Sequence, residues 1–195
     1  LSVSREVRIV TNLCVFWDEI FMAQDAGVAL FTKPVEMLSA DVHFRGFSRN
    51  IVAESREQPE QFLYDVVSPV SQWNPTPGLY TRYGDVAPLI GRVDDQLVVM
   101  ASGDEMSLSF RAGALPPPAA GWKRDYLLKV DGWAKDRDAN TAYSQSVEPM
   151  PFHAMSRYPY PPNEHFPSDA VHNEYRKQYN TRTAVTLVSP LVTSN

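Results

Sequence analysis

The sequence predicts an all-β fold, an antiparallel β-sandwich or jelly roll with long Pro-rich loops and a short C-terminal helix. Short runs in which apolar and polar residues alternate are separated by turn residues, and no regular succession of strand and helix patterns interrupts them. Alternation with a period of two is typical of half-buried strands, whereas a parallel α/β sheet needs a helix between successive strands. The 195 residues include 16 Pro, a residue that suits loops because it lacks a backbone donor.

The first strands are predicted before residue 50. Two are expected between residues 6 and 24, and a third at residues 35–47. Apolar residues recur at alternate positions in these runs (Val7, Ile9, Leu13, Val15, Trp17, Val42, Phe44). Gly46 interrupts the end of the third strand and can let another stretch of backbone approach closely.

The middle of the chain predicts a hairpin. The apolar run at residues 96–101 is typical of a central strand, and residues 102–104 are a tight connection into a strand at 106–110. A short strand is expected at residues 79–83, after an ordered Pro-rich loop at 68–78.

The last part of the chain changes in composition. Residues 115–121 form a stiff Pro-rich connector into a strand at 125–130, with Tyr126, Leu128 and Val130 on one face. Further on, Ser168-Asp169 can cap a short helix that ends at Tyr179. We expect a single domain, with a sandwich core at residues 1–141 and a Pro- and aromatic-rich tail at 142–195 packed on it.

Charge and composition exclude several functions. A net charge of −5 argues against nucleic acid as a partner, because nucleic-acid binding needs a clustered basic surface. No apolar run is long enough to predict a membrane span. The chain starts at Leu1 with no recognisable signal peptide, so we expect a fragment of a longer chain or a processed product.

Catalytic motifs are not apparent in the sequence. Cys14 lies in a hydrophobic run without a neighbouring cation, which favours a buried, inert thiol. The four histidines (His43, His153, His165, His172) do not have the spacing of a transition-metal site, and a surface or hydrogen-bonding role is expected for them. Neither a nucleophile elbow nor a phosphate-binding glycine loop is present. The sequence therefore predicts a protein that is not an enzyme.

One acidic run has the spacing of a calcium loop. Asp136, Asp138 and Asn140 place oxygen ligands at every second position, as an EF-hand does at its first three ligand positions. Thr141 and Val147 then occupy the positions that need Gly and Glu, so the EF-hand match fails. A different cation site, completed by Asp131 or Glu148, is one interpretation, and a polar turn with Asx hydrogen bonds is the other. No cofactor is predicted, with calcium the one that stays open.

Aromatic residues in loops and at strand ends suggest a binding surface. Rings that lie beside fixed polar groups bind sugars or peptides by stacking. The candidates for ligand binding are five aromatic residues (Trp73, Tyr80, Tyr83, Trp122, Trp133). Alternatively, these rings fill the ends of the sandwich and fix the Pro-rich tail to it.

Several motifs together resemble a known family. These are Gly-Trp-Lys-Arg-Asp-Tyr-Leu-Leu at 121–128, Asp-Gly-Trp-Ala-Lys-Asp-Arg-Asp-Ala-Asn-Thr at 131–141, Gln-Ser-Val-Glu-Pro-Met-Pro-Phe at 145–152 and Met-Ser-Arg-Tyr-Pro-Tyr-Pro-Pro at 155–162. Earlier landmarks lie at residues 11–18, 44–47, 80–85 and 102–105. The set resembles the C-terminal region of bacterial FG-GAP (VCBS) repeat proteins with an ASPIC/UnbV domain, relatives of the cartilage acidic protein type. The FG-GAP calcium loops and the ASPIC segment itself are not found here.

The resemblance implies a secreted or envelope-associated parent protein and supplies no catalytic residues. We therefore expect an extracytoplasmic, non-enzymatic accessory domain that binds protein or carbohydrate. Two alternatives stay open: a calcium-binding or metal-dependent module, and a purely structural domain that packs on the repeats of its parent. An exposed apolar patch on the isolated domain would favour the structural role.

Overall fold

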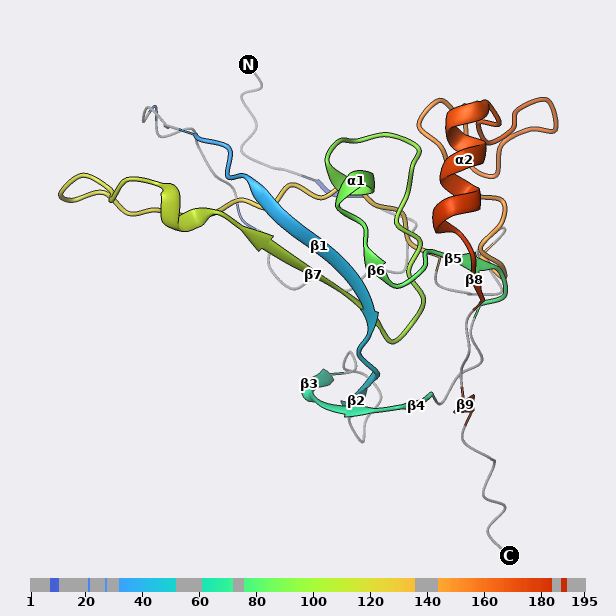
Figure 1. The fold of residues 1–195 in the computed structure, drawn as a ribbon, viewed down its shortest axis with the longest axis horizontal. Coiled ribbons are helices and arrows are strands. Elements are labelled where there is room, and N and C mark those ends of the chain that lie inside the picture. Colours follow the sequence, from blue (N-terminus) through green and yellow to red (C-terminus); the bar gives the residue numbers. More distant parts are fainter. Residues whose placement is uncertain are drawn as a thin grey trace, which may run out of the picture.

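The fold is mainly β, with antiparallel strand pairs and two helices in the described part of the chain (Figure 1). The computed structural model describes residues 8–10, 21, 27, 32–51, 61–71, 76–135, 144–183 and 187–188. The strands are β1 (Met37–Phe44), β2 (Phe47–Ile51), β3 (Gln61–Ser68), β4 (Val70–Ser71), β5 (Leu79–Tyr80), β6 (Gly84–Asp85), β7 (Asp104–Phe110), β8 (Arg182–Thr183) and β9 (Leu187–Val188). The helices are α1 (Ala87–Ile90) and α2 (Ala170–Tyr179), and a 3₁₀ turn spans Ala112–Ala114.

The largest sheet has the strand order β6-β1-β7, and both of its pairings are antiparallel. β1 and β7 run side by side through the middle of the molecule in Figure 1, and they are in register from Ser39↔Ser109 to Phe44↔Asp104. Ala40 and Val42, two residues apart, are buried on the same face of β1, as the period of a strand requires. The strand predicted at residues 106–110 is confirmed, as is much of the strand predicted at 35–47.

Three smaller pairs complete the described strands. β2 and β3 form an antiparallel pair, as do β5 and β8. β4 and β9 pair in parallel, which departs from the wholly antiparallel arrangement expected from the sequence. Each of these two strands has only two residues, so a pattern of alternation could not have revealed them.

Two predicted strands are wrong. Residues 96–101 are not part of a strand. Val99 N donates to the Thr81 side chain, at 2.8 Å from Oγ1, rather than to a strand partner, and Thr81 N donates to Val99 O at 2.9 Å. Residues 125–130 have no strand partner in the described chain and are exposed throughout. The predicted hairpin, in which residues 102–104 connect 96–101 to the next strand, is also wrong, because β7 pairs with β1 and not with residues 96–101.

The core draws on widely separated parts of the chain. It contains Val42 and Val86 from the sheet region, Met150 and Phe152 from the Pro-rich segment, and tyrosines of α2. The predicted helix is confirmed, and Asp169 caps it by accepting hydrogen bonds from the amides of Val171 and His172. Among the described residues, neither helix has the length and apolar character needed to cross a membrane.

The turn from β1 to β2 brings three segments together. The amides of Arg45 and Gly46 both donate to Gly103 O, at 2.9 and 3.0 Å. Gly46 has φ +113°, and a Cβ there would lie 3.0 Å from Ser68 O. The close backbone approach predicted at this glycine is therefore present.

Candidate binding surface

Tyr80 and Tyr83, two of the predicted ligand-binding residues, are tied into the fold. Tyr80 is only 3% exposed, and its hydroxyl donates to Thr76 O at 2.6 Å. Tyr83 donates to Asp104 Oδ1 at 2.9 Å, and the Arg182 guanidinium lies 4.2 Å from the centre of its ring. Burial argues against Tyr80 as an open stacking platform, and Arg182 covers one face of Tyr83.

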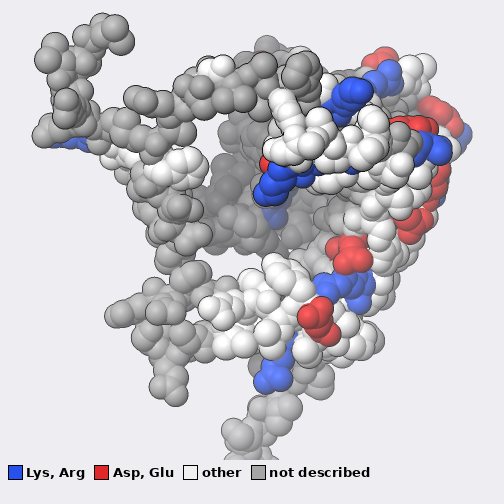
Figure 2. Space-filling model, turned by 90° about the vertical axis from the view of Figure 1, so that its left-hand side faces the viewer, with Lys and Arg blue, Asp and Glu red and all other residues white. Residues whose placement is uncertain are grey.

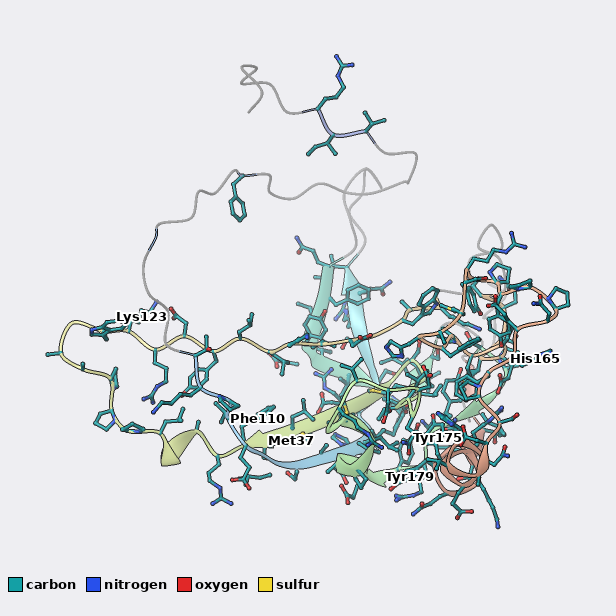
Figure 3. The ribbon with its side chains drawn as sticks, turned by 90° about the horizontal axis from the view of Figure 1, so that it is seen from above. Met37, Phe110, Lys123, His165, Tyr175 and Tyr179 are labelled. Carbon is teal, nitrogen blue, oxygen red and sulfur yellow. The ribbon has the colours of Figure 1, made fainter. Side chains whose placement is uncertain are left out.

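The two described tryptophans remain accessible. Trp122 and Trp133 are 54% and 53% exposed, and Trp133 lies 5.0 Å from the ring of Tyr158. Trp122 precedes Lys123, which lies at the opposite end of the molecule from Tyr175 and Tyr179 in Figure 3. Trp73 lies outside the described residues. The described candidate aromatics therefore do not converge on one platform.

Asp131, a predicted metal ligand, belongs instead to a cluster that the sequence did not reveal. His153 Nδ1 lies 2.8 Å from Asp95 Oδ1, and its Nε2 lies 3.5 Å from Asp131 Oδ2. The backbone amide of His153 also donates to Asp95 Oδ1 at 2.8 Å. The hydrogen bond to Asp95, helped by that to Asp131, raises the pKa of His153 above its ordinary value. The three residues are 22 to 58 positions apart, so no local motif could have identified them.

In this cluster, His153 lies between two carboxylates and links the segments that carry them. Because each ring nitrogen faces a carboxylate, neither is directed at a nucleophile, as a general base requires. Within the described ranges, no group of three or more His, Cys, Asp or Glu side chains is arranged to hold a metal ion. Asp136, Asp138 and Asn140 lie outside those ranges, and the calcium hypothesis for them stays a prediction.

Lys135 is bonded to the Pro-rich region at residues 146–149. Its Nζ donates to three backbone carbonyl oxygens, of Ser146 at 3.1 Å, Val147 at 2.7 Å and Pro149 at 2.7 Å. The same ammonium lies 5.3 Å from the ring centre of Tyr158, whose hydroxyl donates to Pro149 O. Burial lowers the pKa of Lys135. Sequence reasoning missed this role, because a lysine that binds carbonyls has no local motif.

An exposed apolar segment leads up to Lys135. We use this name for residues 122–133, which carry six large apolar side chains between 53% and 95% exposed (Trp122, Tyr126, Leu127, Leu128, Val130, Trp133). Residues 125–130 make no backbone hydrogen bond to another described segment. Monomeric proteins rarely expose contiguous apolar area on this scale outside interaction sites.

The end of this segment lines a broad, open hollow of about 2420 Å³. Its described walls come from β1 and β7, the β2–β3 pair and the Pro-rich region around Phe152. Figure 2 shows described acidic and basic side chains mixed on the face drawn, beside uncharged surface. The described part of that face therefore has no extended area of a single charge.

Comparisons with family models, with curated proteins and with solved structures found no match.

Proposed function

We propose that this chain is a non-enzymatic, protein-binding accessory domain of the β-sandwich class, and that its exposed apolar segment is the contact surface. The observation that carries the proposal is the exposure of that segment, including Leu127 at 95%. Covering a large apolar side chain contributes about 1.5–3 kcal/mol, so a surface with six of them favours association.

Backbone chemistry supports a protein rather than a sugar as the main partner. Residues 125–130 are extended and their amides and carbonyls make no bond to another described segment. An extended polypeptide can satisfy such groups by adding to them as a strand. A sugar-binding site needs aromatic rings and polar groups that converge, whereas Tyr83, Trp122 and Trp133 are dispersed.

The family resemblance supports a location and a parent protein for the domain. It implies an extracytoplasmic parent protein in which the domain serves as an accessory part. A structural domain packed on its parent and a domain that binds a separate protein share the same requirement: the exposed apolar segment is covered in the assembled protein. That shared requirement is what the first experiment addresses.

The test is hydrogen exchange on the natural full-length protein and on this chain alone. We expect amides of residues 125–130 to exchange quickly in the isolated chain, because they make no backbone hydrogen bond to another described segment, and slowly in the full-length protein. The amides of β7 that face β1 are paired in the sheet, so they serve as the internal control and should be protected in both samples. Equally fast exchange of 125–130 in both samples would contradict the proposal.

Carbohydrate binding is a second candidate, favoured by one observation. Trp133 is half-exposed, packs on Tyr158 and follows Asp131 by two residues on a segment that lines the hollow. Titration of the chain with soluble polysaccharides, followed by tryptophan fluorescence, tests this function. A saturable change in the wild type that disappears in Trp133→Ala and persists in Trp122→Ala would support it, and unchanged fluorescence would count against it.

A further inference from the structure

The odd-numbered side chains within residues 123–131 form a charge pattern in which reversing the order exchanges the signs. The odd-numbered positions are Lys123, Asp125, Leu127, Lys129 and Asp131, which read positive, negative, apolar, positive, negative. Lys123 Nζ lies 3.5 Å from Asp125 Oδ1, so these two side chains are on the same side of the extended segment. Read backwards, every positive position falls on a negative one and the leucine falls on itself.

We propose that this segment pairs with a second copy of the same chain as an antiparallel β-ladder, with the two-fold axis at Leu127. Asp125 of one copy then faces Lys129 of the other, and Lys123 faces Asp131. On the opposite side of the ladder, Tyr126 faces Leu128. Residues opposite each other in an antiparallel pair have Cβ atoms about 4.5–5.5 Å apart, within reach of such contacts. The inference rests on the proposed function and names the partner of the same surface.

The charges select this register over its neighbours. If one strand shifts by two residues along the other in one direction, Lys123 lies opposite Lys129. If it shifts by two residues in the other direction, Asp125 lies opposite Asp131. An in-register parallel arrangement places each charge opposite its own copy. Like charges directly opposite each other destabilise a strand pair, so only the register centred on Leu127 satisfies all the charges on this face.

A two-fold interface of this kind stops at a dimer, because each copy contributes the same strand to the one interface. The pairing also supplies partners for backbone groups of residues 125–130, which make no bond to another described segment of their own chain. A single strand pair is a small interface, so we expect a weak dimer whose population rises with protein concentration. Asp131 also lies 3.5 Å from His153 Nε2, so the central pair of Asp125 and Lys129 is the better target for mutation.

The test uses two charge-reversal variants and their mixture. Lys129→Glu places two carboxylates opposite each other, and Asp125→Lys places two ammonium groups opposite each other. In sedimentation velocity at low salt, we expect the wild type to dimerise with rising concentration and each variant alone to associate at least tenfold more weakly. An equimolar mixture of the two variants restores both ion pairs, so it should dimerise as the wild type does.

Recovery in the mixture cannot come from a variant that fails to fold. Lys177→Glu, at an exposed position on α2, has the same charge change and should dimerise as the wild type does. A wild type that stays monomeric at millimolar concentration would overturn the inference, as would a mixture that remains monomeric. Protection of residues 125–130 in the full-length protein that does not vary with concentration would also overturn it, while leaving the proposed protein-binding function intact.

Discussion

Asp104 connects three parts of the chain through one carboxylate. It is the first residue of β7, and its side chain is only 1% exposed. It accepts hydrogen bonds from Ala101 N at 2.7 Å, from the Tyr83 hydroxyl at 2.9 Å and from Arg182 Nη2 at 2.5 Å. Arg182 also donates from Nε to Thr81 O, so the pair joins β8 to the sheet region.

Removing this carboxylate should be costly. Asp104→Ala leaves the guanidinium of Arg182, whose side chain is 17% exposed, without its counter-ion. Breaking a buried pair on one side typically costs about 3–5 kcal/mol, and we expect a loss of about 3 kcal/mol in the free energy of unfolding by urea denaturation. Glu36→Ala removes the partner of Arg111 in an exposed pair and should cost less than about 1 kcal/mol. Equal losses for the two variants would contradict the prediction.

His153 should make stability depend on pH. Its pKa is raised chiefly by the hydrogen bond to Asp95, so the folded protein binds its proton more tightly than the unfolded chain does. The stabilisation is fully present below the unfolded pKa of about 6.5 and is lost as the pH rises through the raised pKa. We therefore expect the wild type to melt higher than His153→Gln by a larger margin at pH 5.5 than at pH 8.5.

The Asp95→Asn background provides the control for this pH effect. Without the Asp95 charge, the main cause of the raised pKa is lost, and the pH-dependent part of the margin should shrink. A margin that is the same at both pH values in the wild-type background would show that His153 is not held as a cation.

At the scale of elements, the turn before β7 shows how backbone geometry and packing act together. Gly103 has φ +87°, and a Cβ there would lie 2.8 Å from Phe44 Cε2 and 3.1 Å from Phe47. Its carbonyl oxygen also accepts the two amides at the start of the β1–β2 connection. The rings of Phe44 and Phe47 meet edge to face, 5.8 Å apart, so little room exists for a side chain between them.

Alanine substitutions at Gly103 and Gly121 distinguish the cost of backbone strain from the cost of a steric clash. Gly103→Ala combines a left-handed backbone with a steric clash, and we expect it to lower the free energy of unfolding by about 3 kcal/mol. Gly121 has φ +81°, but no described atom beyond its two chain neighbours lies within 4 Å of the position that a Cβ would occupy, so Gly121→Ala should cost only about 1 kcal/mol of strain. Thermal melts of both variants measure the difference. An equal cost would mean that the phenylalanines move aside freely.

Elements with a local chemical signal were predictable from the sequence. β7 was predicted because Met106, Leu108 and Phe110 alternate with Ser, and α2 because Asp169 is a good cap before a helical run. Residues 96–101 and 125–130 have equally good strand patterns but depart from strand structure. A strand needs a partner, and the partner is chosen by the whole chain rather than by the segment.

The candidate site was predictable only in part, for a related reason. Trp133 and Asp131 were identified from residue type, and both line the hollow. Asp95, His153 and Lys135 were missed as a group because their contacts join positions far apart in the sequence. Tyr80 is a core residue in the structure, because an aromatic residue in a loop-rich region can equally well fill the core.

At the scale of the whole molecule, the core depends on the C-terminal part of the chain. Tyr175 and Tyr179 of α2 are 2% and 8% exposed and stack on each other, and the Tyr175 hydroxyl donates to Leu97 O at 2.5 Å. Burial raises the pKa of Tyr175 to about 12. The bond from Tyr175 to Leu97 joins α2 to the apolar run at residues 96–101 across 78 positions.

Truncation should therefore abolish cooperative folding. A chain ending at residue 168 lacks both tyrosines and Arg182, and we expect it to show no sigmoidal thermal transition in near-ultraviolet circular dichroism. A chain ending at residue 188 keeps the described C-terminal contacts and should melt close to the wild type. A sharp transition in the shorter chain would show that the core closes without α2.

The contact between Arg182 and Thr81 spans 101 positions. During synthesis, the ribosome releases Thr81 before Arg182, and this pair cannot form until Arg182 has left the exit tunnel. Long-range contacts of this kind also slow folding in free solution, because the chain must close a large loop before the contact contributes. Until α2 and Arg182 have emerged, the apolar residues of the core that they help to close stay partly uncovered, and such exposed surface favours aggregation.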